Sequence, residues 1–303
     1  MFRVPALTTV NRLLEPLRQR IERQVFRVNG LSLNEFDLTQ PPGDAGLFGP
    51  ESVVWRVHGD FPSMLCGGIS ALLLQMLHPA ALAGVWDHSN FRADMLGRLR
   101  RTSQFIAVTT FGNQADANTL IERVKNIHLR VSGVDNYQQP YAASDPALLT
   151  WVHVAETSSF LAAHLRYRNP QLSLREQDDY YTEAARIAQA LGAESLPTSV
   201  AETQRYLEQM RPALRFDART AEVTRLLWQA PAPHWMAYPV MRTMLYGGTG
   251  LLPLWAQQMS GAELPRWRQQ FTDSQIHLVA RLLRWSVRRG AWHRARARMG
   301  YPP

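Results

Sequence analysis

The chain of 303 residues has almost no cysteine or lysine, since Cys66 and Lys125 are the only ones. A single cysteine excludes an intramolecular disulfide and a zinc site made of thiolates. A bound metal would therefore need ligands from the nine histidines and from carboxylates. Because lysine is nearly absent, arginine carries the formal net charge of +8. The preference for arginine over lysine is more typical of a GC-rich, bacterial coding sequence than of selection for binding a particular partner.

Long apolar runs are also missing, and none reaches the ~20 residues that a membrane-spanning helix needs. The longest extends from Met64 to Leu77 and is interrupted by two glycines and a glutamine. We expect it to form a buried core helix. Residues 1–24 contain arginines and two glutamates but lack the apolar segment of a secretory signal. These patterns predict a cytoplasmic protein, with peripheral membrane association as the alternative.

Basic charge is concentrated only near the C terminus. The arginines of this segment are Arg281, Arg284, Arg288, Arg289, Arg294, Arg296 and Arg298. We expect a solvated helix face followed by a frayed basic tail over residues 290–303. The alternative is contact with an anionic membrane surface or another polyanion, because clustered basic charge attracts both. No specific nucleic-acid partner is predicted.

The composition and the hydrophobic pattern predict one all-α domain over residues 1–303. Hydrophobic residues make up 46% of the chain and charged residues 19%, which excludes disorder and allows a large core. Apolar residues recur at helical spacing between proline and glycine breaks. The predicted helices are 7–26, 62–78, 80–85, 94–111, 116–131, 145–167, 173–191, 199–209, 218–227, 239–246, 265 to the low 270s, and 274–289. Residues 29–49 are predicted to be a loop, and Ser52–His58 either a strand or a helix.

Several familiar catalytic motifs are absent. The sequence has no Gly-x-Ser-x-Gly elbow, no His-Glu-x-x-His pair and no Glu-x-x-His pair. The last absence argues against a di-iron carboxylate bundle. His153 and Glu156 come nearest to such a pair, but their order is reversed. The segment Gly247-Gly-Thr-Gly250 lacks the lysine and the spacing of a phosphate loop, and we interpret it as a turn.

Three histidines are candidates for a ligand role. His128 lies beside an apolar helical stripe that includes Val124 and Ile127, so its imidazole is expected to point into the core. His153 shares a predicted helix face with apolar residues in the same way. His78 precedes a proline at a helix end, where capping is the simplest explanation. Each of the first two is either a ligand or a hydrogen-bonded core side chain.

A second cluster consists of Arg98, Arg101 and Thr102. Residues three and four apart share one helix face, and apolar residues follow them, so this helix is expected to enter the core. An arginine in a core must find anionic or carbonyl partners. These partners are either carboxylates elsewhere in the protein or the propionates and oxygen ligands of a buried cofactor.

A set of fragments occurs in a fixed order along residues 50–170. They are Gly67-Gly-Ile-Ser-Ala-Leu-Leu-Leu-Gln-Met-Leu-His78-Pro79, Gly84-Val-Trp-Asp-His88-Ser, Arg98-Leu-Arg-Arg-Thr102, Thr110-Phe-Gly112, His128 with Val131 and Gly133, and Tyr141-Ala-Ala-Ser-Asp145-Pro-Ala-Leu-Leu-Thr-Trp151-Val-His153. Together they resemble the family of latex-clearing rubber oxygenases and MpaB. The C-terminal helices over 173–289 and the tail over 290–303 resemble it less.

The resemblance implies an all-α fold that holds a b-type haem in its helical core. It also implies that His128 is the proximal iron ligand and that Arg98, Arg101 and Thr102 lie on the distal side. Arg101 stands where the rubber oxygenases have a lysine that can ligate iron, and an arginine stays protonated and cannot do so in the same way. The distal ligand is therefore water, His78 or nothing. His153, on the next helix, is a candidate for a supporting hydrogen bond.

These implications lead to a haem-dependent oxygenase that acts with dioxygen on a hydrophobic, isoprenoid or lipid-like substrate. The base for such a reaction stays open between Glu156, Asp87 and neither. One alternative is a haem-binding or structural protein without turnover. Another is a membrane-surface or polyanion binder that uses the arginine-rich C terminus.

Overall fold

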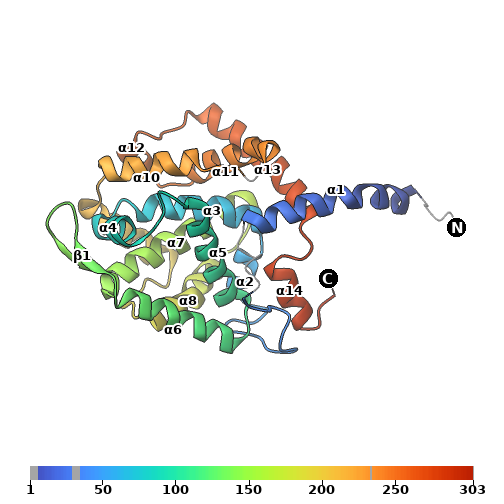
Figure 1. The fold of residues 1–303 in the computed structure, drawn as a ribbon, viewed down its shortest axis with the longest axis horizontal. Helices are drawn as coiled ribbons and strands as arrows, with labels where there is room; N and C mark the ends of the chain where they lie inside the picture. The colour runs from blue at the N-terminus through green and yellow to red at the C-terminus, as the bar shows by residue number, and fades with distance from the viewer. Residues whose placement is uncertain (1–5, 29–34, 233, 303) are drawn as a thin grey trace.

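The computed structural model describes residues 6–28, 35–232 and 234–302, and helices dominate this part of the chain (Figure 1). The all-α prediction is confirmed. The α-helices of these residues are α1 (Ala6–Val28), α2 (Val53–His58), α3 (Phe61–Gln75), α4 (Pro79–His88), α5 (Met95–Phe111), α6 (Gln114–His128), α7 (Pro146–Tyr167), α8 (Leu174–Leu191), α9 (Val200–Met210), α10 (Ala218–Gln229), α11 (Tyr238–Thr249), α12 (Leu254–Ser260), α13 (Arg266–Ser286) and α14 (Ala291–Arg298). The same residues include an antiparallel hairpin of β1 (Ser132–Val134) and β2 (Pro140–Ala142), and the 3₁₀ turns η2 (Arg211–Ala213) and η3 (Trp235–Ala237).

Helices α3 and α7 form the centre of the fold and run antiparallel to one another. Gly67 lies against Phe160, since a Cβ atom at Gly67 would stand only 2.9 Å from the Phe160 ring. At the other end, the Trp151 indole N–H donates to the Gln75 carbonyl at 3.2 Å. Most residues of α3 are buried, as predicted for the apolar run from Met64 to Leu77.

The apolar helices of the described residues were compared with the length and hydropathy of a membrane span. Taken one at a time, no helix of the described residues combines the length and the apolar character needed to cross a bilayer. Helices α3 and α4 meet both conditions only as a pair, and the two helices are bent by 103° at the break between them. Most of α3 is buried inside the protein.

The structure settles or corrects several local predictions. Ser52–His58 gives the helix α2, which Ser52 caps by accepting a hydrogen bond from the Trp55 N–H. Helix α13 is continuous, although Ser274 was expected to begin a second helix. The Ser274 hydroxyl donates back to the Gln270 carbonyl at 2.9 Å inside the helix, so Ser274 does not cap a new helix. The hairpin and α12 were missed because they are too short to show a period.

The turn predicted for Gly247-Gly-Thr-Gly250 is wrong for its first three residues, which end α11, whereas Gly250 is the C-cap and begins a turn. A Cβ atom at Gly247 would stand 2.2 Å from the Ile276 side chain of α13. One at Gly248 would stand 2.5 Å from the Ile69 side chain of α3. The two glycines therefore allow α11 to pack closely against both neighbouring helices.

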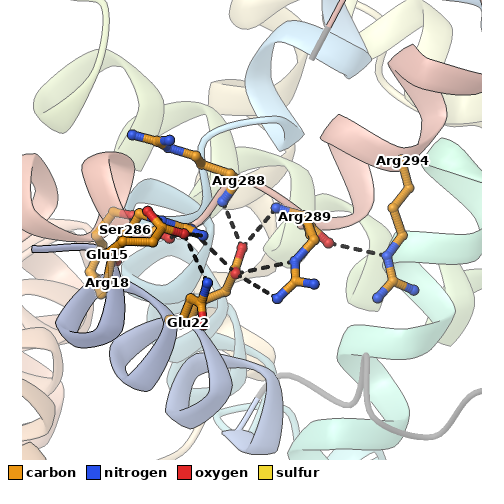
Figure 2. Close-up of polar contacts among 9 residues, drawn as sticks. Glu15, Arg18, Glu22, Ser286, Arg288, Arg289 and Arg294 are labelled. Carbon is orange, nitrogen blue, oxygen red and sulfur yellow. Dashed lines mark hydrogen bonds and ion pairs between the residues drawn. The ribbon is translucent and has the colours of Figure 1, made fainter. Parts of the chain in front are cut away.

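Helix α1 is fastened to the segment between α13 and α14 by the fully buried carboxylate of Glu22 (Figure 2). Glu22 accepts the backbone N–H groups of Arg288 and Arg289 at 2.8 and 2.9 Å. It also accepts the guanidinium groups of Arg289 and Arg18 at 3.1 and 3.3 Å. Arg18 donates further to the Ser286 carbonyl at 2.8 Å. A buried charge requires such partners, so these contacts fix the two segments together.

The frayed tail expected over residues 290–303 is wrong, because residues 291–298 form α14 and Arg298 is buried. The Arg298 guanidinium donates to three main-chain carbonyls at distances of 2.7 to 3.2 Å, those of Leu38, Asp44 and Gly112. It therefore joins the C-terminal helix to the loop that precedes α2. This internal pairing leaves less basic charge for an outside polyanion than the sequence indicated.

Candidate functional site

The Arg98 side chain of α5 and the Glu156 side chain of α7 are close enough to attract one another, and these two charges form the centre of the candidate site. Arg98 is half-buried, and this burial lowers the pKa of its guanidinium to about 10. The neighbouring Arg101 lowers this pKa further, whereas the attraction of Glu156 raises it. No residue of the described ranges accepts a hydrogen bond from the Arg98 guanidinium. Arg98 is thus only half-buried, and its five N–H donors are available to a ligand.

Glu156 is the only acidic residue of α7, and the protein surrounds its carboxyl group. Burial raises the pKa of Glu156 to about 7, although a hydrogen bond with Gln75 and the attraction of Arg98 both favour the charged form. The carboxyl group is therefore poised to gain or lose a proton near neutral pH. Asp87, the other candidate base, is exposed and accepts a hydrogen bond from Tyr141 at 3.1 Å. The structure thus favours Glu156.

His128 lies in the last turn of α6 and is half-buried. Its Nδ1 atom is buried and has no hydrogen-bond partner among the described residues. The apolar stripe that predicted an inward imidazole needs correction, because Ile127 is 53% exposed. The buried face of α6 contains Ala117 and Ile121 instead, and His128 continues it at helical spacing. Burial lowers the pKa of His128, which favours the neutral imidazole that a metal requires.

His153 lies three residues before Glu156 on α7, so the two side chains share a helix face. The protein surrounds its ring, and burial lowers the pKa of His153 to about 4. Its Nε2 atom is buried without a hydrogen-bond partner in the described part of the chain. His153 is therefore neutral near pH 7 and has one ring nitrogen available to a ligand.

His78 occupies a different place from the other predicted site residues. It is the N-cap residue of α4, but its side chain makes no capping hydrogen bond, so the capping interpretation is wrong. Its ring lies 6.0 Å from the Trp151 ring, and its Nδ1 atom has no partner among the described residues. It borders an open cleft of about 840 Å³ together with Asp135 and Asp145. The structure does not bring His78 to Arg98.

Thr102 and Arg101 are adjacent and both exposed, but they have different surroundings. The Thr102 hydroxyl donates to the Arg98 carbonyl at 3.3 Å, and Thr102 borders an apolar cavity of about 180 Å³. Phe160, one helical turn after Glu156, borders the same cavity. The cavity thus begins next to the Arg98–Glu156 pair. Arg101 is exposed, and only its charge acts on Arg98.

A buried polar cluster at the far side of this cavity was not recognised in the sequence. The His58 ring donates to or accepts from the Thr110 hydroxyl at 2.9 Å and the Tyr180 hydroxyl at 3.0 Å. Burial lowers the pKa of His58 to about 3, so its ring stays neutral. Glu156 acts electrostatically on Tyr180 as well. Only the tertiary packing of α2, α5 and α8 joins these residues, so no local pattern could have revealed them.

Comparison with known families adds a separate finding. Residues 55–288 match the family model described as ER-bound oxygenase mpaB/B'/Rubber oxygenase, catalytic domain. The chain belongs to this family. No curated protein and no solved structure matches the chain.

The part that matches the mpaB and rubber oxygenase family begins within α2 and ends just after α13. It contains Arg98, Thr102, His128, His153 and Glu156. Helices α1 and α14 lie outside it, although α1 packs against α13 and α14 packs against α5. The family therefore accounts for the centre of the candidate site but not for these two flanking helices.

Proposed function

We propose that this protein is a haem-dependent oxygenase that acts with dioxygen on a hydrophobic, isoprenoid or lipid-like substrate. The observation that carries the proposal is the half-buried Arg98 guanidinium, which Glu156 attracts and whose donors have no acceptor among the described residues. A partly desolvated cation of this kind is stabilised by an anionic or oxygen ligand that accepts its hydrogen bonds. Membership of an oxygenase family supports the same reaction class.

The chemistry of the surrounding donors fits a haem. His128 and His153 each have a buried ring nitrogen without a partner in the described chain, and burial keeps both rings neutral. A neutral imidazole is the usual axial ligand of haem iron. We assign His128 to the iron and Arg98 to a propionate or an oxygen ligand, with His153 as a further cofactor contact. Bound haem would supply the redox chemistry with dioxygen.

The residues of this chain would position the substrate and handle protons. Arg98 and Thr102 present N–H and O–H donors from one face of α5. Glu156, with a pKa near 7, can accept a proton from the substrate or return one to the product. The apolar cavity beside Thr102 excludes water and receives a hydrophobic group.

The test is haem uptake by the folded protein, followed by absorption spectroscopy. We expect the wild type to bind added haemin in a 1:1 complex with a sharp Soret band. His128→Ala should lose this band or shift it strongly. His277→Ala is the matched control, because His277 is exposed on α13, and it should bind haemin as the wild type does.

Oxygen consumption then separates an oxygenase from a haem carrier. The reduced haem complex should consume dioxygen when an isoprenoid alcohol is added, and Glu156→Gln should slow this consumption. Folded wild type that takes up no haemin would contradict the proposal. Haem uptake without any substrate-dependent oxygen consumption would favour a non-catalytic haem protein.

A further inference from the structure

An apolar cavity and a charged cleft, here called the two hollows, adjoin one another near α5. The first is the apolar cavity of about 180 Å³ that Thr102 borders. The second is an open cleft of about 650 Å³ with a charged lining. Both are bordered by Phe61 at the start of α3 and by Val287, Trp292 and His293. The shared residues place the charged cleft directly beside the apolar cavity.

The apolar cavity has walls that come from both inside and outside the family domain. Leu99 and Ile106 of α5 and Phe160 of α7 line it from inside the matched range. Phe26 of α1 and Trp292 of α14 line it from outside that range. The walls contributed by the flanking helices are therefore features of this chain that membership of the family does not supply.

The contacts of Glu22 hold these outer walls in place. Glu22 stands one helical turn before Phe26 on α1, and it binds the backbone of Arg288 and Arg289 next to Val287 (Figure 2). Residues 287–293 therefore keep a defined position between the cavity and the cleft. A rigid border of this kind can orient a molecule that occupies both.

The cleft carries an excess of positive charge. Its charged lining consists of Arg56, Arg168, Arg284 and one carboxylate, Asp60, and Arg56 is paired at 2.6 Å with Glu176 outside the lining. Arg284 already satisfies Asp60 with two hydrogen bonds, at 2.7 and 2.9 Å. Arg168 stands 4.0 Å from the same carboxylate, is 54% exposed and donates no side-chain hydrogen bond to any residue of the described ranges. Apart from this long ion pair, the hydrogen-bond donors of its guanidinium are available to an anion.

A buried histidine lies in the wall of this cleft. His164 of α7 is 4% exposed and borders the cleft. Its Nδ1 atom is closed to solvent and has no hydrogen-bond partner among the described residues. The exposed Arg168 guanidinium is therefore the group that binds a polar head in the open cleft.

We propose that the apolar cavity and the cleft together bind a single-chain amphiphile with an anionic head group. The alkyl or alkenyl chain occupies the cavity beside Thr102, and the carboxylate or phosphate head lies in the cleft at Arg168. The role of this molecule as the oxygenated substrate rests on the proposed function, whereas its binding does not. Charge complementarity selects the anionic head, and the apolar walls select the chain.

The test uses the full chain without haem and follows the displacement of a fluorescent fatty acid. The competing probes are laurate, dodecanol and inorganic phosphate. Wild type should bind laurate more tightly than dodecanol. Arg168→Gln should weaken laurate binding about tenfold, as expected for the loss of a charged hydrogen bond, and leave dodecanol unchanged. Ala107→Leu, which fills the cavity from α5, should weaken both.

The control is Arg205→Gln, because Arg205 is exposed on α9, and this variant should match the wild type. If Ala107→Leu does not fold, Gly68→Leu fills the same cavity from α3. Equal affinity of wild type for laurate and dodecanol would overturn the head-group assignment. Unchanged laurate binding by both cavity-filling variants would overturn the chain assignment, and displacement by phosphate alone would overturn the two-part site.

Haem titration separates this proposal from the proposed function. Failure of haem uptake, with the laurate pattern as expected, would remove the oxygenase and leave the amphiphile site in place. Haem uptake that depends on His128, together with equal binding of laurate and dodecanol, would support the haem site and overturn the amphiphile site. Arg168→Gln should leave the Soret band of the haem complex unchanged, since Arg168 lies outside the Arg98–Glu156 site.

Discussion

Asp60 and Arg284 lie 224 positions apart in the chain and form a two-point ion pair, with N–O distances of 2.7 and 2.9 Å. Asp60 also caps α3 by accepting from the Ser63 N–H, and Arg284 donates to the Tyr167 carbonyl at the end of α7. Three helices therefore meet at this pair. Burial alone would raise the pKa of Asp60, but the hydrogen bonds from Arg284 and Ser63 outweigh it and hold the pKa below its ordinary value.

We expect Asp60→Asn to lower the free energy of unfolding by about 2–4 kcal/mol at pH 7, because it leaves the partly buried Arg284 without its charge partner. The pKa of Asp60 is lowered in the folded state, so its stabilisation is present above the unfolded pKa and is lost as the pH falls through the folded pKa. The difference between wild type and variant should shrink in acid. Urea denaturation at pH 7 and pH 3 measures both values.

The control for this prediction is Glu222→Gln on α10. Glu222 pairs with Arg225 three residues later on an exposed helix face. Solvent and salt screen such a pair, so no clear loss of stability is expected. A loss as small for Asp60→Asn as for this control would mean that the Asp60–Arg284 pair does not hold the three helices together.

Glu156 affects the pH dependence of stability in the opposite direction from Asp60. Its folded pKa of about 7 is raised above the ordinary value of 4.5 by burial, so the folded state prefers the protonated carboxyl. The stabilisation from this proton is complete below pH 4.5 and is lost as the pH rises to about 7. In haem-free protein, we expect wild type to lose roughly 3 kcal/mol between pH 4.5 and 8 relative to Glu156→Gln.

The measurement is the free energy of unfolding of both proteins across this pH range. Glu263→Gln, at an exposed position, should keep the pH dependence of the wild type. Parallel curves for wild type and Glu156→Gln would show that the pKa of Glu156 is the same in the folded and unfolded states, and that burial does not raise it.

The sequence predicted the helices well wherever a cap and a break marked their ends. The start at Asp145-Pro146 and the stop at Gly112 both occur where the sequence indicated. Ser274 was misleading, because a serine can cap a helix or bond back to the preceding turn, and the local sequence does not distinguish these. The two glycines at the end of α11 were misleading for a related reason. Glycine serves close helix packing as readily as a turn, and only the tertiary neighbours decide between them.

The candidate site could be predicted in part. Arg98 and His153 were recognised because their helix faces were visible in the hydrophobic period, and both are half-buried in the structure. Glu156 was left open as a base, although it is the only acidic residue on an apolar helix, which was the available signal. The cleft at Arg168 could not be predicted, because its residues come from segments that only the folded chain brings together.

Glu22 should matter more to stability than its neighbour Glu15 on the same helix. Glu22→Gln keeps the shape of the side chain but removes the charge that Arg18 and Arg289 share (Figure 2). We expect a loss of about 2–4 kcal/mol in the free energy of unfolding. We also expect faster amide hydrogen exchange at Arg288 and Arg289, since their N–H groups lose a charged acceptor.

Glu15→Gln is the matched control, because Glu15 pairs with Arg18 at a largely solvent-exposed position. It should leave the amide exchange of residues 288 and 289 unchanged. Equal exchange rates at these amides in wild type and Glu22→Gln would show that Glu22 does not hold the segment that borders the two hollows.

Adjacent glycines on α3 test the close packing at the centre of the fold. A Cβ atom at Gly67 would stand 2.9 and 3.0 Å from the ring and the Cα atom of Phe160. One at Gly68 would meet only the Phe160 ring, at 3.9 Å.

Alanine favours a helix over glycine by about 1 kcal/mol at either position, but main-chain crowding outweighs this gain at Gly67. Gly67→Ala should therefore lower the free energy of unfolding by about 1–3 kcal/mol, whereas Gly68→Ala should leave it unchanged or raise it. Thermal and urea denaturation of the two variants compare these effects within one helix, and a loss for Gly68→Ala equal to that for Gly67→Ala would contradict the packing described for α3 and α7.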